Sequence, residues 1–119
     1  MVNDVHLNNK NKNITNHIVT KWFKKKGWYY YNHQLETLSA VKEKKDVLVI
    51  SPTGTGKTLS GFLPSFFDLI DEKKNINKFH TLYISPLKSL TYDIERNLLE
   101  PIKGFNLNIS IQSRTGDTN

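Results

Sequence analysis

Eight residues in the first half of the chain have the types and spacing of a loop that holds phosphate groups. The run is Ser51-Pro52-Thr53-Gly54-Thr55-Gly56-Lys57-Thr58, with two glycines directly before a Lys-Thr pair. Glycines let the backbone turn tightly, so successive N–H groups can converge on phosphate oxygens. The spacing therefore predicts a site for the phosphates of a nucleoside triphosphate.

The side chains of this loop have different expected roles. Lys57 places a positive charge at the β- and γ-phosphates, and Thr58 offers its hydroxyl to a Mg²⁺ ion that bridges them. We therefore predict Lys57 and Thr58 as the catalytic groups and Thr58 as the metal ligand. Ser51 replaces the more usual Gly or Ala and is small enough to fit. The residues expected to hold the nucleotide phosphates are Thr53, Gly54, Thr55, Gly56, Lys57 and Thr58.

The segments around the loop have the periods of a strand and a helix. Residues 46–51 form a short β-branched run that is typical of a strand buried on both faces. Apolar residues from Leu59 to Ile70 recur at helical spacing, and Pro64 falls early enough to bend that helix without ending it. Further strands are predicted at 80–85 and 107–111, with a helix between them that stops around residues 101–104.

Alternating strands and helices favour an α/β fold with a parallel sheet sandwiched by helices. Residues 1–13 are rich in Asn and lack apolar periodicity, so they are predicted to be a disordered lead-in. A basic helix is expected to start at Ile14 and to stop at Gly27. Asn32 can cap a second helix with a buried stripe of Leu35, Leu38 and Val41.

The composition suits an anionic partner and contains nothing that points to an oxidising compartment. Seventeen Lys and Arg against eleven Asp and Glu give a formal charge of +6, although a generally basic surface explains the charge equally well. The chain has no cysteine, which excludes disulfides and thiolate metal sites. No apolar run approaches the roughly 20 residues that cross a bilayer. We expect a cytoplasmic protein with no membrane partner.

Residues 86–89 suit contact with a nucleic-acid backbone, whereas for residues 114–118 such contact is implied only by the family resemblance described next. Pro86 ends the predicted strand at 80–85, and Lys88 with Ser89 then opens a helix, where both can hold phosphates without reading sequence. Residues 114–118, which include Thr115 and Gly116, form a second loop; on its own this loop is an unremarkable turn.

The motifs together resemble the large helicase-related (Lhr) group of superfamily 2 DEAD/DEAH-box helicases. The resemblance covers Trp22 to the end and rests on the phosphate loop, the 82–90 segment and the 114–118 loop. Gln34 is similar to the glutamine with which these helicases read adenine, the alternative being a surface glutamine. The resemblance implies a RecA-like P-loop NTPase fold, with residues 14–119 as the N-terminal part of its first ATP-binding domain.

The resemblance also implies an ATP-dependent enzyme that moves on single-stranded DNA and is associated with DNA repair. The acidic motif II and the second RecA-like lobe of the group would lie after Asn119. We therefore expect the chain alone to bind ATP weakly and not to turn it over. Two alternatives stay open, which are an RNA-acting helicase and a truncated, non-catalytic nucleic-acid-binding module.

Overall fold

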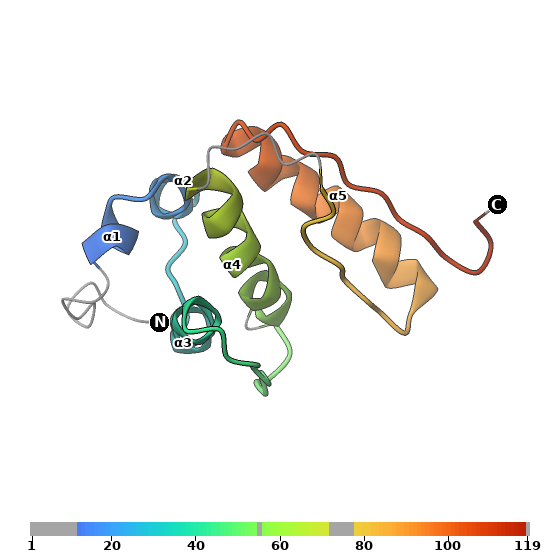
Figure 1. Cartoon of the computed structure of the whole chain (residues 1–119), viewed down its shortest axis with the longest axis horizontal. Helices are drawn as coiled ribbons and strands as arrows, with labels where there is room; N and C mark the ends of the chain where they lie inside the picture. The colour runs from blue at the N-terminus through green and yellow to red at the C-terminus, as the bar shows by residue number, and fades with distance from the viewer. Residues whose placement is uncertain (1–11, 55, 72–77, 119) are drawn as a thin grey trace. The chain divides into compact units, whose positions relative to one another are not determined.

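Figure 1 shows a computed structural model of the chain, which describes residues 12–54, 56–71 and 78–118. The helices of these residues are α1 (Lys12–Thr15), α2 (Ile18–Lys26), α3 (Asn32–Lys42), α4 (Lys57–Asp71) and α5 (Lys88–Gly104). The chain divides into two compact units, residues 1–74 and 75–119, each described by itself below. None of the helices in the described part is both long enough and apolar enough to cross a bilayer.

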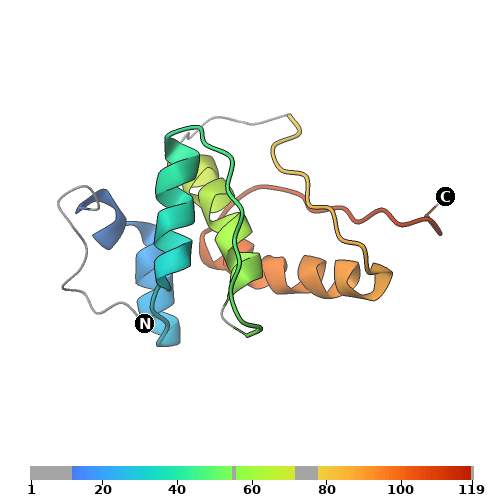
Figure 2. The same ribbon diagram turned by 90° about the horizontal axis from the view of Figure 1, so that it is seen from below.

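Unit 1 is organised around the packing of α3 on α4, which Figure 2 shows from below. Leu38 of α3 and Leu63 of α4 are almost completely buried, with 1% and 0% of their surface exposed. Aromatic rings from α2 and α4 enlarge this core, because each removes a large apolar area from water. The buried apolar residues of the unit are Ile14, Val19, Phe23, Tyr30, Leu38, Phe62, Leu63, Phe66 and Phe67.

The first predicted helix is divided in two. Lys12 and Asn13, assigned to the disordered lead-in, begin α1, and residues 1–11 of that lead-in lie outside the described residues. The continuous helix expected from Ile14 is wrong, because His17 has an extended backbone and caps α2 by accepting a hydrogen bond from the Val19 N–H at 3.3 Å. The predicted stop at Gly27 is confirmed, with a left-handed φ of 72° that a glycine adopts without strain.

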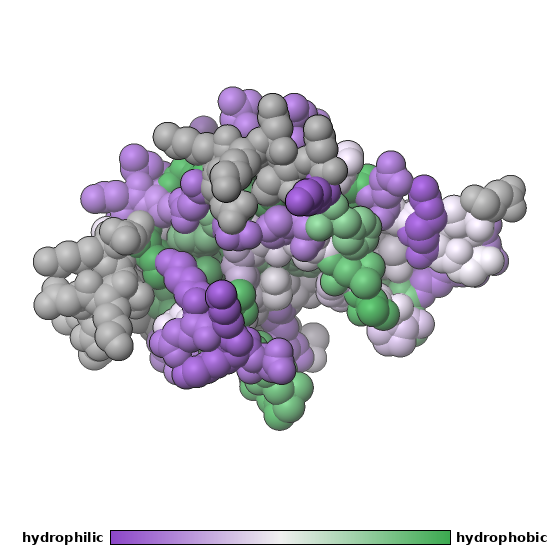
Figure 3. All heavy atoms as spheres, in the orientation of Figure 1, coloured by the Kyte–Doolittle hydropathy of each residue, from purple (hydrophilic) through white to green (hydrophobic). Residues whose placement is uncertain are grey.

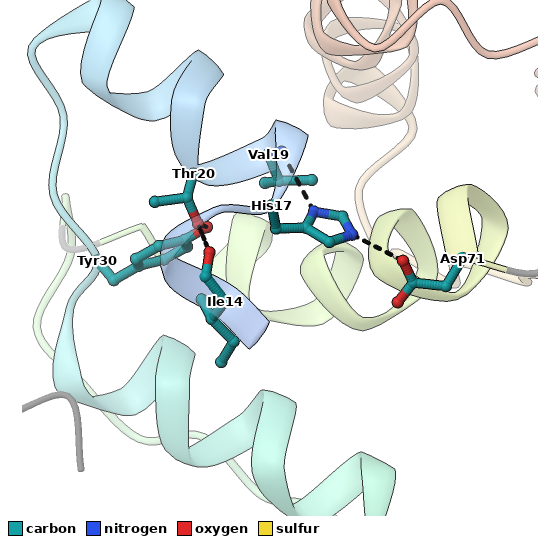
Figure 4. Close-up of polar contacts among 6 residues, drawn as sticks. All are labelled: Ile14, His17, Val19, Thr20, Tyr30 and Asp71. Atoms are coloured by element: carbon teal, nitrogen blue, oxygen red, sulfur yellow. Dashed lines mark hydrogen bonds and ion pairs between the residues drawn. The ribbon is translucent and has the colours of Figure 1, made fainter. Parts of the chain in front are cut away.

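Polar contacts fasten α2 to the rest of unit 1 (Figure 4). His17 stacks on Phe67 at 4.1 Å between ring centroids, and its Nε2 lies 2.9 Å from the Asp71 carboxylate at the end of α4. The Thr20 hydroxyl donates to the Ile14 carbonyl at 2.5 Å, so the Tyr30 hydroxyl, 2.7 Å away, donates to Thr20. Burial raises the pKa of Tyr30 to about 12, which keeps this hydroxyl protonated.

Helix α3 buries Leu38 as predicted and half-buries Leu35, but its buried face is shifted from the predicted stripe. The buried residues are Gln34, Thr37 and Leu38, whereas Val41 is 41% exposed. The N-cap is Tyr31, one residue before the predicted Asn32. The expected stripe counted apolar residues only, but α4 covers the face that contains Gln34, and this polar side chain is buried because its hydrogen bonds are satisfied there.

The predicted helix after the phosphate loop is confirmed as α4. It passes through Pro64, which bends the helix path at most and does not end it. Its buried apolar face is formed by Phe62, Leu63, Phe66 and Phe67, at the i, i+1, i+4, i+5 spacing of one helix side. Residues 72–77, which follow it, lie outside the described residues.

The predicted parallel sheet is not confirmed. Residues 46–51, 80–85 and 107–111 form no strand in the part of the chain that the structure describes. Leu48, Ile50 and Ile84 are 85%, 86% and 81% exposed, and Figure 3 shows apolar side chains, in green, gathered over the segment that links α3 to α4. A strand forms only beside a hydrogen-bonded neighbour, and consecutive strands are neighbours in only about two-thirds of cases. The sequence pattern of these three segments therefore does not specify the partner that each would need.

Unit 2 consists of α5 and the segments on either side of it. The helix ends at Gly104, within the predicted stop, and the Leu107 N–H bonds back to the Ile102 carbonyl at 3.0 Å. Ile102 and Phe105 are buried at this end. Residues 107–118 then return along α5, held by contacts of Ser113 with Glu95 and of Asp117 with Lys88 (Figure 1).

Candidate nucleotide-binding site

The phosphate loop joins the segment after α3 to the start of α4. Gly54 and Gly56 have left-handed φ angles of 82° and 70°. In this region an L-residue with a Cβ is strained by about 1–2 kcal/mol. A Cβ on Gly56 would also lie 2.7 Å from Gln34 Nε2, so the end of the Gln34 side chain would have to shift. Thr55 lies outside the described residues.

Lys57 and Thr58 form the first turn of α4, and both are exposed to solvent. The first N–H groups of a helix have no partner within the helix, and the helix dipole makes this end positive. Among the described residues no ion pair includes Lys57. An accessible cation at the positive end of a helix, directly after two left-handed glycines, can bind phosphate oxygens.

Gln34 contacts the phosphate loop directly, and the alternative of a surface glutamine is therefore wrong. Its side chain is 1% exposed, and its Nε2 donates to the Gly56 carbonyl at 3.2 Å. Its Oε1 accepts from the Tyr31 N–H at 2.9 Å, one half of a capping box at the start of α3. In this state both ends of the Gln34 amide bind protein atoms, and adenine reading stays a prediction.

Two residues that no sequence pattern singled out are linked to the loop, Ser60 directly and His33 through Ser60. Ser60, in the first turns of α4, donates its hydroxyl to the Gly56 carbonyl at 3.2 Å. His33 Nδ1 lies 2.7 Å from that hydroxyl oxygen. The position of His33 directly before Gln34 was visible in the sequence, but its proximity to Ser60 depends on how α3 crosses α4.

The residues predicted to contact nucleic acid all belong to unit 2. Leu87 is the N-cap of α5, so Lys88 and Ser89 open this helix as expected. Lys88 forms an ion pair with Asp117, which brings the residue 86–89 turn and the residue 115–118 turn together. The second turn is closed by the Thr118 N–H, which donates to the Thr115 carbonyl at 3.0 Å. Pro86 and Gly116 lie within these two turns, and both are predicted contacts.

Two left-handed glycines before an exposed lysine at a helix start are the features that the predicted phosphate loop requires. The sequence profile of DEAD/DEAH box helicases matches residues 31–119, three-quarters of the chain, from the turn before Gln34 through both unit 2 turns. The chain belongs to the DEAD/DEAH box helicase family. Membership implies a RecA-like P-loop fold, of which the described residues show helices.

Relatives of known name agree with this family. An ATP-dependent helicase Lhr-Core of Methanocaldococcus jannaschii is 42% identical over 113 residues, 84% of this chain and 13% of that protein. An Lhr helicase/uracil glycosylase of Escherichia coli is 36% identical over 102 residues, 71% of this chain and 7% of that protein. An ATP-dependent rRNA helicase of Vanderwaltozyma polyspora is 39% identical over 66 residues, 51% of this chain and 11% of that protein.

The chain thus spans about one-eighth of the length of the Lhr-Core relative from Methanocaldococcus jannaschii. No solved structure matches the chain. The comparisons establish the family, and they leave the nucleic-acid substrate to be inferred from the residues and tested.

Proposed function

We propose that the chain is the ATP-binding part of an ATP-dependent DNA helicase or translocase that acts on single-stranded DNA. The observation that carries the proposal is the P-loop, with two left-handed glycines, an exposed Lys57 at the start of α4 and Gln34 against the loop. The Lhr names of the relatives support ATP-dependent helicase activity. The uracil glycosylase in the name of the Escherichia coli relative supports DNA repair as its setting.

In this proposal ATP binds to the loop at residues 53–58. The backbone N–H groups around Gly54 and Gly56 hold phosphate oxygens, and Lys57 neutralises charge at the β- and γ-phosphates. The Thr58 hydroxyl would be a ligand for Mg²⁺, which would help to neutralise the phosphate charge. The fit rests on the exposure of Lys57 and Thr58 at the helix start, which leaves both side chains accessible to a nucleotide.

The nucleic-acid strand is proposed to follow the two turns of unit 2. Lys88 supplies the positive charge, and Ser89, Thr115 and the Gly116 backbone supply hydrogen-bond donors to phosphates. Because Asp117 pairs with Lys88, a bound phosphate competes with this carboxylate for the lysine. Both side chains are more than half exposed, so the ion pair itself contributes little to stability and can exchange readily.

Replacing Lys88 by Ala is expected to weaken binding to single-stranded oligonucleotides of every sequence alike. Each phosphate contact releases counterions, so affinity falls as salt rises. When this contact is lost, the negative slope of log affinity against log salt concentration should become less steep by about 0.7–1 unit. The measurement is a fluorescence anisotropy titration at several salt concentrations with oligonucleotides of different base composition.

Two further variants make this result specific. Asp117→Asn should strengthen binding, because it removes the carboxylate that competes for Lys88. Lys25→Ala removes an exposed lysine of the same charge from α2 in unit 1 and should change binding less. A larger loss with Lys25→Ala than with Lys88→Ala would move the contact to α2 and refute the proposed strand path.

A second candidate is a helicase that acts on RNA, which the rRNA helicase name of the Vanderwaltozyma polyspora relative favours. The proposed contacts are to phosphates, which DNA and RNA share, whereas the 2′-hydroxyl distinguishes them. Competition between matched DNA and RNA strands decides between the two. Preferential displacement by RNA would favour the second candidate.

A further inference from the structure

The carbonyl of Gly56, in the phosphate loop, accepts several hydrogen bonds. It accepts hydrogen bonds from Gln34 Nε2 at 3.2 Å, from the Ser60 N–H at 3.1 Å and from the Ser60 hydroxyl at 3.2 Å. Ser60 is fully buried, and its backbone bond is the first of the α4 ladder. The donors come from two helices, so the orientation of this one peptide group is fixed from both α3 and α4.

The count of hydrogens assigns a direction to the contact between Ser60 and His33. A serine hydroxyl carries one hydrogen, and in Ser60 this hydrogen goes to the Gly56 carbonyl, which can only accept. We assign the hydrogen of the 2.7 Å contact to His33 Nδ1, because the Ser60 hydroxyl hydrogen is then left for the Gly56 carbonyl. His33 Nδ1–H donates to Ser60, and Ser60 donates to Gly56.

The orientation of the Gly56 carbonyl determines where the next N–H group points. In a planar trans peptide the carbonyl of one residue and the N–H of the next point in opposite directions. No peptide bond among the described residues is cis. Because the Gly56 carbonyl is held towards Gln34 and Ser60, the Lys57 N–H is directed away from them, as a donor at the start of α4 with no hydrogen-bond partner among the described residues.

We propose that His33 is a positioning residue for the phosphate loop, acting through Ser60 on the Gly56–Lys57 peptide. The hydrogen-bond chain from His33 prepares the Lys57 N–H to meet a phosphate oxygen before the nucleotide arrives. The proposal rests on the function proposed above, because it assumes that the anion at this N–H is a phosphate of ATP. It assigns to His33 a role separate from that of Gln34, which contacts the same carbonyl directly.

If the His33 ring acted only through packing, His33→Phe would bind MgATP normally and His33→Asn would bind it weakly. The positioning role predicts the reverse. The His33 ring also stacks on Tyr31, with centroids 5.4 Å apart and planes at 11°. His33→Phe keeps an aromatic ring for this stacking and removes the donor. His33→Asn removes the ring and keeps an N–H donor, since the asparagine amide nitrogen occupies nearly the place of Nδ1.

The first experiment measures the MgATP affinity of the chain by calorimetry for His33→Phe, His33→Asn and Ser60→Ala. His33→Phe and Ser60→Ala should each weaken binding by about two- to tenfold, the value of one neutral hydrogen bond. His33→Asn should stay close to the parent chain. The double variant His33→Phe/Ser60→Ala should be no weaker than either single one, because both break one hydrogen-bond chain. Normal binding by His33→Phe with weakened binding by His33→Asn would overturn the proposal.

A second experiment needs no nucleotide and separates this proposal from the proposed function. Nitrogen NMR of the His33 ring should show a hydrogen on Nδ1. The backbone amide hydrogen of Ser60 should exchange with solvent faster in His33→Phe than in His33→Asn. An unprotonated Nδ1, or equal exchange in the two variants, would overturn the role of His33 whether or not ATP binds. If both signatures appear but the parent chain binds no MgATP, the proposed function fails and the hydrogen-bond chain stands.

Discussion

Replacing Lys57 by Ala is expected to reduce MgATP binding by about ten- to a hundredfold, since a hydrogen bond to a charged group contributes about 1.5–3 kcal/mol. Lys57 is the exposed cation at the start of α4, directly after the left-handed Gly56. Without it the phosphates face only backbone dipoles. Calorimetry with MgATP, or titration with a fluorescent analogue, measures the loss.

The matched control for this substitution is Lys25→Ala. Lys25 is also exposed on a helix, but it lies in the last turn of α2, away from the loop in sequence. Lys25→Ala changes the net charge of the chain by the same amount as Lys57→Ala. A difference in MgATP affinity between the two variants therefore reports the position of the lysine and not the loss of charge. Equal MgATP affinity for Lys57→Ala and the parent chain would contradict the assignment of residues 51–58 as a phosphate loop.

The second large effect is expected on stability. Leu63 is 0% exposed in the centre of α4, where this helix packs against α3. Leu63→Ala should lower the free energy of unfolding of unit 1 by about 2–5 kcal/mol, because it removes buried methyl groups and leaves a cavity. This is a large fraction of the roughly 5–15 kcal/mol that stabilises a typical domain. Urea unfolding followed by circular dichroism measures the change.

Leu48→Ala is the matched control, because it deletes the same atoms from a side chain that is 85% exposed. It should change the free energy of unfolding by no more than about 0.5 kcal/mol. The pair also tests the sheet that the structure does not confirm. A loss at Leu48 as large as that at Leu63 would mean that residues 46–51 pack as a buried strand in solution.

Features that depend on a few adjacent residues were predictable from the sequence. The stop of α2 at Gly27 follows from the freedom of glycine to adopt positive φ, and the end of α5 falls at Gly104, within the predicted range. The phosphate loop is local as well, since its two glycines and Lys57 lie within four residues. Such features need no knowledge of which elements pack together.

Features that depend on distant residues were predicted less well. The burial of Gln34 follows from the crossing of α3 and α4, which no pattern of apolar residues within α3 contains. The ion pair of Lys88 with Asp117 joins residues 29 positions apart. The predicted strands also depend on distant residues, because alternation within a segment does not specify which other strand lies beside it.

The most direct test of the central claim is to follow the backbone amides of the chain by NMR while MgATP is added. If residues 51–58 hold the phosphates, the largest shift changes should fall on the amides of Gly54, Gly56, Lys57 and Thr58, whose N–H groups belong to the phosphate loop and the first turn of α4. Smaller changes are expected at Gln34, which contacts Gly56. Unchanged loop amides at a MgATP concentration that shifts other residues would contradict the account.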